Sequence, residues 1–448
     1  MLLTYKQHRV NILVNTWAPN ILSRVLGFPF VFLVISLAWS PGIFSAENKT
    51  AGQHDYHYAG TLDIEAETGF IKADWQITVF DPAETDITFF LRNTLSGIEV
   101  TGDDVTHVKT DKQPGPEGFW LVNVTLAPSP DDAAGKNRQI QISYSGVLIP
   151  EPMDNRINAI EVGRVELNVD SFWFPIDNRF AKFLSAELTV HIGDGWQGVT
   201  TGEAIPIEGG FKIVNTDPRM DIAFSLSKSF HITQSDGFTI YDQRDQYEGT
   251  DRLVATANKC RGYLDERFGQ TDPLPVAKLL ITERASSGYA RENYIAFTDI
   301  SETKPAPLMR FVCHEFAHYW SRGAKFDTVD NWINEAFAEY LGLMAVREYM
   351  GQADYDEMLA SFAKQIAEKD LPRIWKKGDT ERTDYLVQYR KGPLVLAKLE
   401  EQIGQEAFLE FTGQYFAAEN KSTEVLIETL ANVSGAEQAS VFVEMLGD

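Results

Sequence analysis

The sequence predicts a multidomain α+β protein, in which an N-terminal antiparallel β-sandwich or saddle-like domain precedes a mainly helical domain. Three observations favour this class. Residues 55–235 contain short segments in which apolar and polar residues alternate, the chain from about residue 305 onward has helical periodicity, and the texture changes near Asp236. The length of 448 residues suits two or three domains that each bury a core.

Residues 1–46 are predicted to be a signal peptide or an N-terminal anchor. Basic residues precede an apolar run at 26–40, which is shorter than the roughly 20 residues that span a bilayer, so a secretory signal is favoured. Phe44 is large for a cleavage site after Ala46, so an uncleaved anchor with membrane association stays open. In either case we expect an exported protein: periplasmic, extracellular or anchored facing outward.

The N-terminal β domain is predicted over residues 47–235. Turn clusters such as TGDD and GPEG separate the alternating segments, which is typical of antiparallel strands with one buried face. The clearest predicted strands are residues 71–80, 85–91, 138–147 and 185–192.

The second domain is predicted over residues 236–448. An amphipathic segment at 248–269 predicts a helix that ends at a glycine, and 275–283 predicts a buried strand. Helical patterns then dominate, at residues 355–369, 393–416 and 437–446.

Charge and cysteine content limit the class of partner and the kind of site. The formal net charge of −24 repels phosphate backbones, so we expect no nucleic acid partner. Cys260 and Cys313 match no metal or redox spacing, and we expect two buried thiols, with a single disulfide left open. The oligomeric state is not indicated.

The sequence HEFAH at residues 314–318 indicates a metal site. His314 and His318 are four residues apart, so on a helix both imidazoles project from one face within reach of one ion. Glu315 follows the first histidine, where its carboxylate can deprotonate a metal-bound water. An amphipathic helix with two incidental histidines is the competing interpretation.

The next predicted helix, WINEAFAEYLG at residues 332–342, favours the metal site. Two histidines leave a catalytic zinc one protein ligand short, and Glu335 can supply a carboxylate. Glu339 lies one helical turn further on, where it can orient a ligand histidine. A solvated helix face is the alternative, but the apolar neighbours of these two residues indicate a buried helix.

The segments HEFAH and NEAFAEY resemble the gluzincin zinc aminopeptidases of the aminopeptidase N type. Residues 287–297 are similar to that family's G-x-M-E-N loop, 388–396 to its Y-E-K-G-x-x-V-L segment, and 171–190 to its Trp-Phe-Pro segment. The resemblance covers roughly residues 165–448. It implies a thermolysin-like metallopeptidase domain that binds one Zn²⁺ per chain and hydrolyses the N-terminal bond of peptide substrates.

The resemblance also implies roles for individual residues. Glu292 would bind the free α-ammonium group of a peptide, and Tyr389 would donate its phenol to the oxyanion of the tetrahedral intermediate. Asn293 and Gly288 would shape the substrate-binding edge. Tyr385, one turn before Tyr389, is expected to be a packing residue.

Three departures from the family pattern bear on substrate preference. Sixteen residues separate His318 from Glu335, where the family usually has eighteen, and a shorter loop can absorb the difference. Arg291 stands where the family has methionine, and a residue is added after Gly288. The sequence stops where the family's catalytic domain ends, so we expect no C-terminal helical domain and a more open cleft.

Two other functions compete with the aminopeptidase hypothesis. A thermolysin-like endopeptidase would need no free amine on its substrate. A catalytically silent binding protein on a peptidase scaffold would have a damaged metal set, whereas the two histidines, Glu335, Glu315 and Tyr389 are all present.

Overall fold

The computed structural model describes residues 54–115, 118–128, 137–148, 158–180, 182–244, 246–282, 288–325 and 327–447. The predicted signal or anchor segment, residues 1–46, lies outside these ranges. No helix in the described ranges has the length and apolar character needed to cross a membrane. The described residues fall within one unit, Lys49–Asp448.

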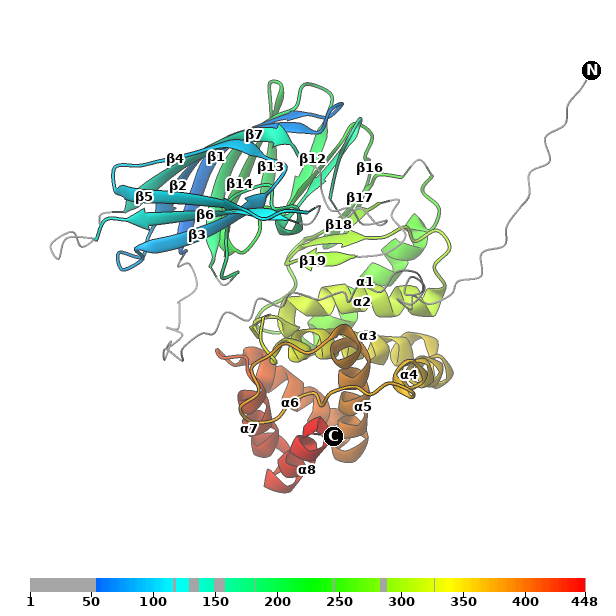
Figure 1. Cartoon of the computed structure of the whole chain (residues 1–448). Helices are drawn as coiled ribbons and strands as arrows, with labels where there is room; N and C mark the ends of the chain where they lie inside the picture. The colour runs from blue at the N-terminus through cyan, green and yellow to red at the C-terminus, as the bar shows by residue number, and fades with distance from the viewer. Residues whose placement is uncertain are drawn as a thin grey trace, which may run out of the picture. The chain divides into compact units, whose positions relative to one another are not determined.

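The largest sheet has seven strands in the order β13-β14-β11-β1-β2-β7-β4 (Figure 1). β1 runs parallel to β11, and the other neighbours are antiparallel. Burial along β2 alternates because successive side chains of a strand point to opposite faces. The strands are β1 (Tyr56–Glu65), β2 (Phe70–Val79), β4 (Ser96–Thr101), β7 (Arg138–Val147), β11 (Leu184–His191), β13 (Glu203–Ile207) and β14 (Gly210–Arg219).

Two four-stranded sheets, β10-β3-β6-β5 and β12-β15-β9-β8, share an apolar core with the large sheet. Trp173 and Phe174, from the predicted Trp-Phe-Pro segment, are fully buried in this core. The strands are β3 (Asp86–Arg92), β5 (Val105–Lys112), β6 (Phe119–Leu126), β8 (Ala159–Glu161), β9 (Arg164–Leu167), β10 (Ile176–Asp177), β12 (Gln197–Thr200) and β15 (Phe224–Ser227).

A mixed five-stranded sheet, β16-β17-β18-β20-β19, begins the second half of the chain. β18 is parallel to both β17 and β20, and the helix α1 (Thr250–Phe268) connects β17 to β18. Nearly every residue of β18 is buried, as expected of a central parallel strand. The strands are β16 (His231–Ser235), β17 (Phe238–Asp242), β18 (Ala277–Ile281), β19 (Tyr289–Arg291) and β20 (Tyr294–Phe297).

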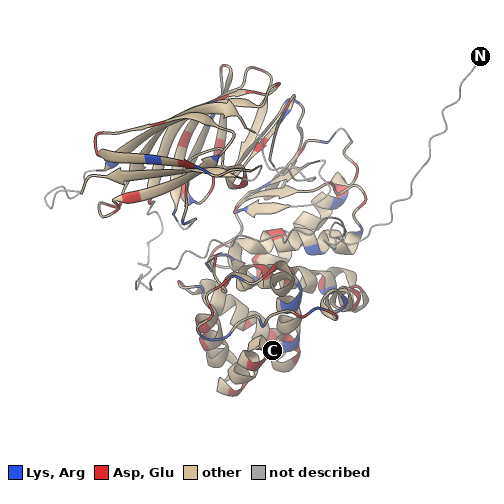
Figure 2. Ribbon diagram, viewed as in Figure 1, with Lys and Arg blue, Asp and Glu red and all other residues tan. Residues whose placement is uncertain are grey.

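The remaining helices build a second apolar core that starts at Phe238 and reaches Leu446. α3 is buried on all sides and is the central helix, since α2, α4 and α5 all pack on it. Acidic and basic residues occur on strands and helices alike (Figure 2). The helices are α2 (Pro305–Ser321), α3 (Asn331–Met350), α4 (Gln352–Ile366), a π-helical turn (Val387–Lys391), α5 (Gly392–Ile403), α6 (Gln405–Ala417), α7 (Thr423–Ser434) and α8 (Ala436–Gly447).

The predicted helical stretch 393–416 is divided into two helices. Gly404 has a φ of 85°, a left-handed conformation that ends α5 and that glycine adopts without a Cβ penalty. The periodicity of the flanking segments continues across this glycine, so the pattern alone did not reveal the break.

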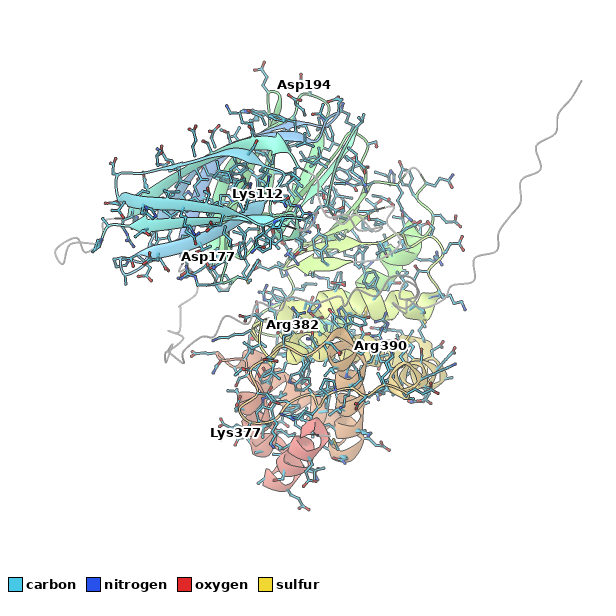
Figure 3. All side chains as sticks on the ribbon, viewed as in Figure 1. Lys112, Asp177, Asp194, Lys377, Arg382 and Arg390 are labelled. Atoms are coloured by element: carbon cyan, nitrogen blue, oxygen red, sulfur yellow. A yellow bond between two sulfur atoms is a disulfide. The ribbon has the colours of Figure 1, made fainter. Side chains whose placement is uncertain are left out.

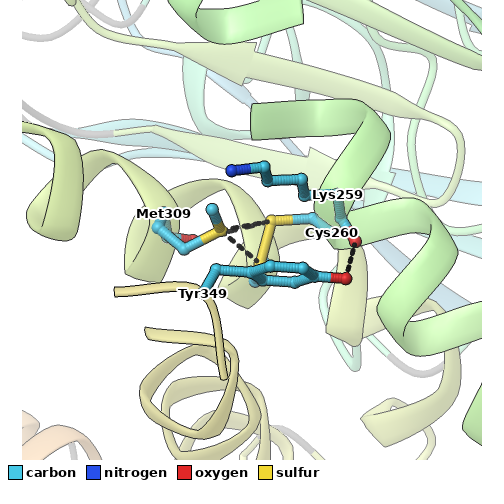
Figure 4. Close-up of a disulfide and its surroundings, with 5 residues drawn as sticks. Lys259, Cys260, Met309 and Tyr349 are labelled. Atoms are coloured by element: carbon cyan, nitrogen blue, oxygen red, sulfur yellow. Dashed lines mark hydrogen bonds between the residues drawn. A yellow bond between two sulfur atoms is a disulfide. The ribbon is translucent and has the colours of Figure 1, made fainter. Parts of the chain in front are cut away.

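The expectation of two free thiols was wrong. Cys260 of α1 and Cys313 of α2 form a disulfide, and both side chains are fully buried (Figure 4). The sulfur of Met309 lies 3.6 Å from each cysteine sulfur. The bond therefore joins α1 to the helix that carries the histidines, one residue before His314.

We expect the double variant Cys260→Ala/Cys313→Ala to unfold more readily than the wild type. The disulfide spans 53 residues of sequence, and closing a loop of this size in the unfolded chain stabilises a protein by about 3–5 kcal/mol in the chain-entropy model. Denaturant unfolding of both proteins under non-reducing conditions measures the difference. Equal free energies of unfolding would contradict the stabilising role.

Candidate metal centre

The helix α2 positions the two candidate histidine ligands. Pro305 begins this helix, where the missing N–H of proline costs nothing, and its apolar residues pack into the helical core. His314 and His318 lie one turn apart, and their Nε2 atoms are 3.1 Å from each other. Burial lowers the pKa of His318 to about 4, so its imidazole is neutral, the form that binds a metal.

The helix α3 brings Glu335 to the histidine pair. Its Oε2 atom lies 3.8 Å from Nε2 of His314 and 3.5 Å from Nε2 of His318. Ligand atoms around a tetrahedral ion with bonds of 2.0–2.1 Å are about 3.3 Å apart, close to these separations. Among the described residues, nothing donates a hydrogen bond to this buried oxygen. The three atoms therefore fit a single divalent ion, which would satisfy the orphaned oxygen.

Nε2 of His314, Nε2 of His318 and Oε2 of Glu335 form the ligand triangle, and Glu315 lies beside it. Its side chain is buried, and it is grouped with the two histidines so that their ligand atoms lie within 4.8 Å of one another. Burial raises the pKa of Glu315 to about 7. A carboxylate with a pKa near neutrality can both accept and return a proton.

Glu339 holds His314 from the side opposite the triangle. Its Oε2 atom lies 2.9 Å from Nδ1 of His314. Two guanidinium groups, those of Arg310 on α2 and Arg390 on the π-helical turn, pair with the same carboxylate. Burial opposes ionisation, yet the charge of Arg310 and the hydrogen bond with His314 lower the pKa of Glu339 to about 2.

This carboxylate orients the first histidine. Burial alone would lower the pKa of His314, but the hydrogen bond and the charge of Glu339 raise it. A carboxylate beside Nδ1 favours the proton on that nitrogen, which leaves the Nε2 lone pair for the ion.

Tyr389 lies over the histidine from the π-helical turn. Its ring stacks on that of His314 with centroids 5.8 Å apart. Burial and the charge of Glu335 raise the pKa of Tyr389, so the phenol keeps its proton and remains a donor. Tyr385, expected to pack structurally, is 55% exposed, and its ring stacks on that of Tyr389 with centroids 4.5 Å apart.

Glu292 occupies a tight turn between β19 and β20. Its φ of 58° is left-handed, a conformation that a residue other than glycine holds only where its surroundings require it. Its carboxylate pairs with Arg219, which comes from the end of β14, and its other oxygen lies 3.5 Å from Arg322. An incoming ammonium group would therefore share this carboxylate with two guanidinium groups.

The other two residues of the predicted substrate edge have structural contacts. A Cβ at Gly288 would lie 2.5 Å from the Phe311 ring, so only glycine lets β19 approach α2 this closely. The side-chain amide of Asn293 donates to the carbonyl of Val276 at the edge of the sheet. Arg291, the methionine position of the family loop, pairs with the buried Asp221.

Sequence reasoning missed the charged residues that surround the predicted ones. Arg310 lies on α2 and Arg322 directly after it, Arg219 ends β14, and Arg390 lies in the π-helical turn. The sequence gives only weak evidence for such arginines, since an arginine four residues before a histidine is also common on a solvated helix.

Glu166 was also not singled out from the sequence. This glutamate of β9 is fully buried and accepts a hydrogen bond from Tyr289 of β19.

Comparison with known proteins addresses the part of the chain that carries these residues. Residues 283–445 match the model of the peptidase family M1 domain. This chain carries a peptidase family M1 domain. The match contains both histidines, Glu335 and Tyr389, and it confirms the resemblance to gluzincin aminopeptidases of the aminopeptidase N type.

Two curated relatives, both aminopeptidases by name, match part of the chain. The chain is 26% identical over 221 residues to endoplasmic reticulum aminopeptidase 2 of Homo sapiens, covering 43% of this chain and 23% of that protein. It is 24% identical over 272 residues to the mitochondrial aminopeptidase 2 of Saccharomyces cerevisiae, covering 52% of this chain and 28% of that protein. The matched region thus spans about a quarter of each relative.

Solved M1 structures share the fold of most of the chain. The M1 zinc metallopeptidase of Deinococcus radiodurans aligns with a TM-score of 0.61 and 16% identity, covering 89% of this chain and 95% of that one. Leukotriene A4 hydrolase of Saccharomyces cerevisiae aligns with a TM-score of 0.62 and 14% identity, covering 90% of this chain and 69% of that one. The predicted order, β-sheet domain before helical peptidase domain, is confirmed.

Proposed function

We propose that this M1 chain is a zinc-dependent aminopeptidase that hydrolyses the N-terminal bond of peptides. The observation that carries the proposal is the triangle formed by Nε2 of His314, Nε2 of His318 and Oε2 of Glu335. These atoms would hold one Zn²⁺, which supplies Lewis acidity to the substrate carbonyl and to water.

The residues around the triangle have separate tasks in this proposal. Glu315 takes a proton from the attacking water and returns it to the leaving amine. The phenol of Tyr389 donates a hydrogen bond to the oxygen on which negative charge develops. Glu339 holds the ring of His314 in place throughout.

Recognition of the peptide amine is assigned to Glu292. A carboxylate that pairs with the α-ammonium group places the first peptide bond at the reacting centre and excludes longer N-terminal segments. A mutant of the D. radiodurans enzyme has been solved with a Tyr-Ser-Ala substrate bound, which supports a peptide as the class of substrate. The ion pairs of Glu292 with Arg219 and Arg322 mean that the amine competes for this carboxylate.

Metal analysis combined with a substrate panel tests the proposal. The wild-type protein should contain one zinc per chain and cleave aminoacyl-fluorophore substrates, but not their Nα-acetylated forms. Equal cleavage of free and acetylated substrates would favour the endopeptidase alternative. Bound zinc without hydrolysis of any peptide would favour the silent binding protein.

We expect Glu292→Gln to raise KM for free-amine substrates by roughly 10- to 100-fold, because a charge-assisted pair with the ammonium group is lost. Steady-state kinetics on one aminoacyl substrate measures the change. Glu357→Gln, which removes the same charge from the exposed face of α4, is the matched control. An unchanged KM in Glu292→Gln would remove Glu292 from amine recognition.

We also propose that the chain works in an oxidising compartment outside the cytosol. The apolar segment within residues 1–46 and the buried Cys260–Cys313 disulfide both support export, since disulfides persist where thiols are not kept reduced. Fractionation of cells that express the full chain, with a thiol-labelling assay on each fraction, tests this. Recovery of reduced protein from the cytosol alone would contradict it.

A further inference from the structure

We propose that Arg390 is a positioning residue that fixes the ring of Tyr389 above the metal site. Figure 3 shows its side chain on the helical half of the chain. Arg390 follows Tyr389 directly in the π-helical turn, and its side chain is largely buried. The inference rests on the proposed function, because Tyr389 is the oxyanion donor of that function.

The ring of Tyr389 stacks on two other rings. Its centroid lies 5.8 Å from that of His314, with the planes 21° apart. The centroid of the Tyr385 ring lies 4.5 Å away, with the planes 22° apart. Because the phenol hydroxyl lies at the end of a rigid ring, the orientation of this three-ring stack sets where the hydroxyl points.

One guanidinium group contacts Tyr385, the main chain of Tyr389 and the carboxylate beside His314. Nη2 of Arg390 donates to the hydroxyl of Tyr385 at 3.0 Å. Nη1 donates to the backbone carbonyl of Tyr389 at 2.7 Å and to Oε1 of Glu339 at 2.9 Å, the carboxylate that also contacts His314. Arg390 therefore contacts the hydroxyl of Tyr385, the main chain of Tyr389, and the carboxylate of Glu339 that lies against His314.

The guanidinium is itself fixed. Its Nε donates to Oε1 of Gln365 at 2.8 Å, and its plane lies over the Phe362 ring at 4.3 Å, so both anchors come from α4. A planar fork with several N–H donors can reach these acceptors at once, which a lysine ammonium cannot. A glutamate, which the family segment Y-E-K-G has at this position, could donate to none of them. The arrangement is thus a property of this chain.

Tyr389 is part of a π-helical turn. The turn Val387–Lys391 leaves the regular α-helical hydrogen-bond pattern, and such turns occur frequently at functional sites. Gly392 closes the turn against α3, where a Cβ would lie 2.7 Å from that of Ala336. Side-chain contacts, rather than helical geometry alone, therefore hold Tyr389 in place.

Kinetics of Arg390→Gln test the positioning role in a double-variant cycle with Tyr389→Phe. We expect kcat to fall by about tenfold or more, with KM within about threefold of wild type. Zinc should stay bound, because Arg310 still pairs with Glu339 when Arg390 is removed. In the Tyr389→Phe background, Arg390→Gln should lower kcat by less than about twofold, because the two residues act through one hydroxyl. Fully additive losses, or loss of zinc in Arg390→Gln, would overturn the proposal.

Three further variants separate positioning from charge and from folding. Arg390→Lys should lose kcat like Arg390→Gln, and recovery of wild-type kcat would show that charge alone suffices. Tyr385→Phe removes only the hydroxyl that Arg390 contacts and should lower kcat by roughly threefold; an unchanged kcat would count against the contact. Arg373→Gln, whose ion pair with Asp379 lies on the surface, is the matched control and should retain wild-type kcat.

A readout that needs no activity keeps this inference distinct from the proposed function. With 3-fluorotyrosine at position 389, the ¹⁹F NMR spectrum should show one sharp line in the wild-type protein and a broadened or split line in Arg390→Gln. Identical spectra would overturn the positioning role even if the wild type is active. A wild-type protein that hydrolyses no peptide would refute the proposed function, while the spectra would still test the role of Arg390.

Discussion

Glu315→Gln is expected to leave Zn²⁺ bound and to lower kcat by roughly 10²- to 10⁴-fold, the usual contribution of general acid–base catalysis. Glutamine has nearly the same shape as glutamate but accepts no proton at neutral pH. The ligand triangle of His314, His318 and Glu335 is unchanged, so the affinity for zinc should stay close to that of the wild type.

Two measurements on the same preparation check this result. Zinc content by mass spectrometry should remain near one ion per chain, while kcat on an aminoacyl-fluorophore substrate falls. Glu357→Gln on α4 controls for the loss of one negative charge. A Glu315→Gln variant that keeps substantial turnover would show that another group moves the proton.

Removal of a metal ligand should instead lower zinc binding first, and the loss of activity should follow from the loss of the metal. In Glu335→Ala and His318→Ala, we expect the affinity for zinc to fall by more than about 100-fold, since changes to residues that merely support a ligand already cost 10–100-fold. Activity should fall in proportion to zinc content. Competition with a chromogenic chelator measures the affinity.

Thermal unfolding gives an independent check on the ligand variants. A metal that binds the folded state raises the free energy of unfolding as its concentration exceeds the Kd, so added zinc should raise the Tm of the wild type. The same zinc concentration should leave the Tm of Glu335→Ala nearly unchanged. A Tm that responds equally in both proteins would place the ion elsewhere.

Local spacing allowed the prediction of most of the metal site from the sequence. His314 and His318 are brought together by a single turn of α2, so no information beyond their own helix was needed. Glu335 was harder to predict, because its position depends on the packing of α3 against α2. The resemblance to the family supported its assignment as the third ligand. The carboxylate of Glu292 was also found by motif, but its two arginine partners were not.

Predictions from the sequence were wrong for Cys260, Cys313 and Tyr385, whose surroundings depend on the three-dimensional structure. The pairing of Cys260 with Cys313 depends on how α1 packs against α2, which no spacing rule predicts. The exposure of Tyr385 and its stacking on Tyr389 depend on the π-helical turn, which has no sequence signature comparable to a cap or a heptad.

From the sequence we could predict the order of the β and helical domains, the two helices that carry the candidate ligands, and the side chains that would bind an ion and move a proton. Periodicity and short spacing carry this information because both are properties of a single helix or strand. Only the packed chain shows which arginines pair with Glu339 and Glu292, that the two cysteines form a disulfide, and which groups Arg390 contacts. Those contacts follow from the packing of elements that are far apart in the sequence. Ion pairs and ring stacks of this kind produce no regular spacing of residues that a sequence pattern could reveal.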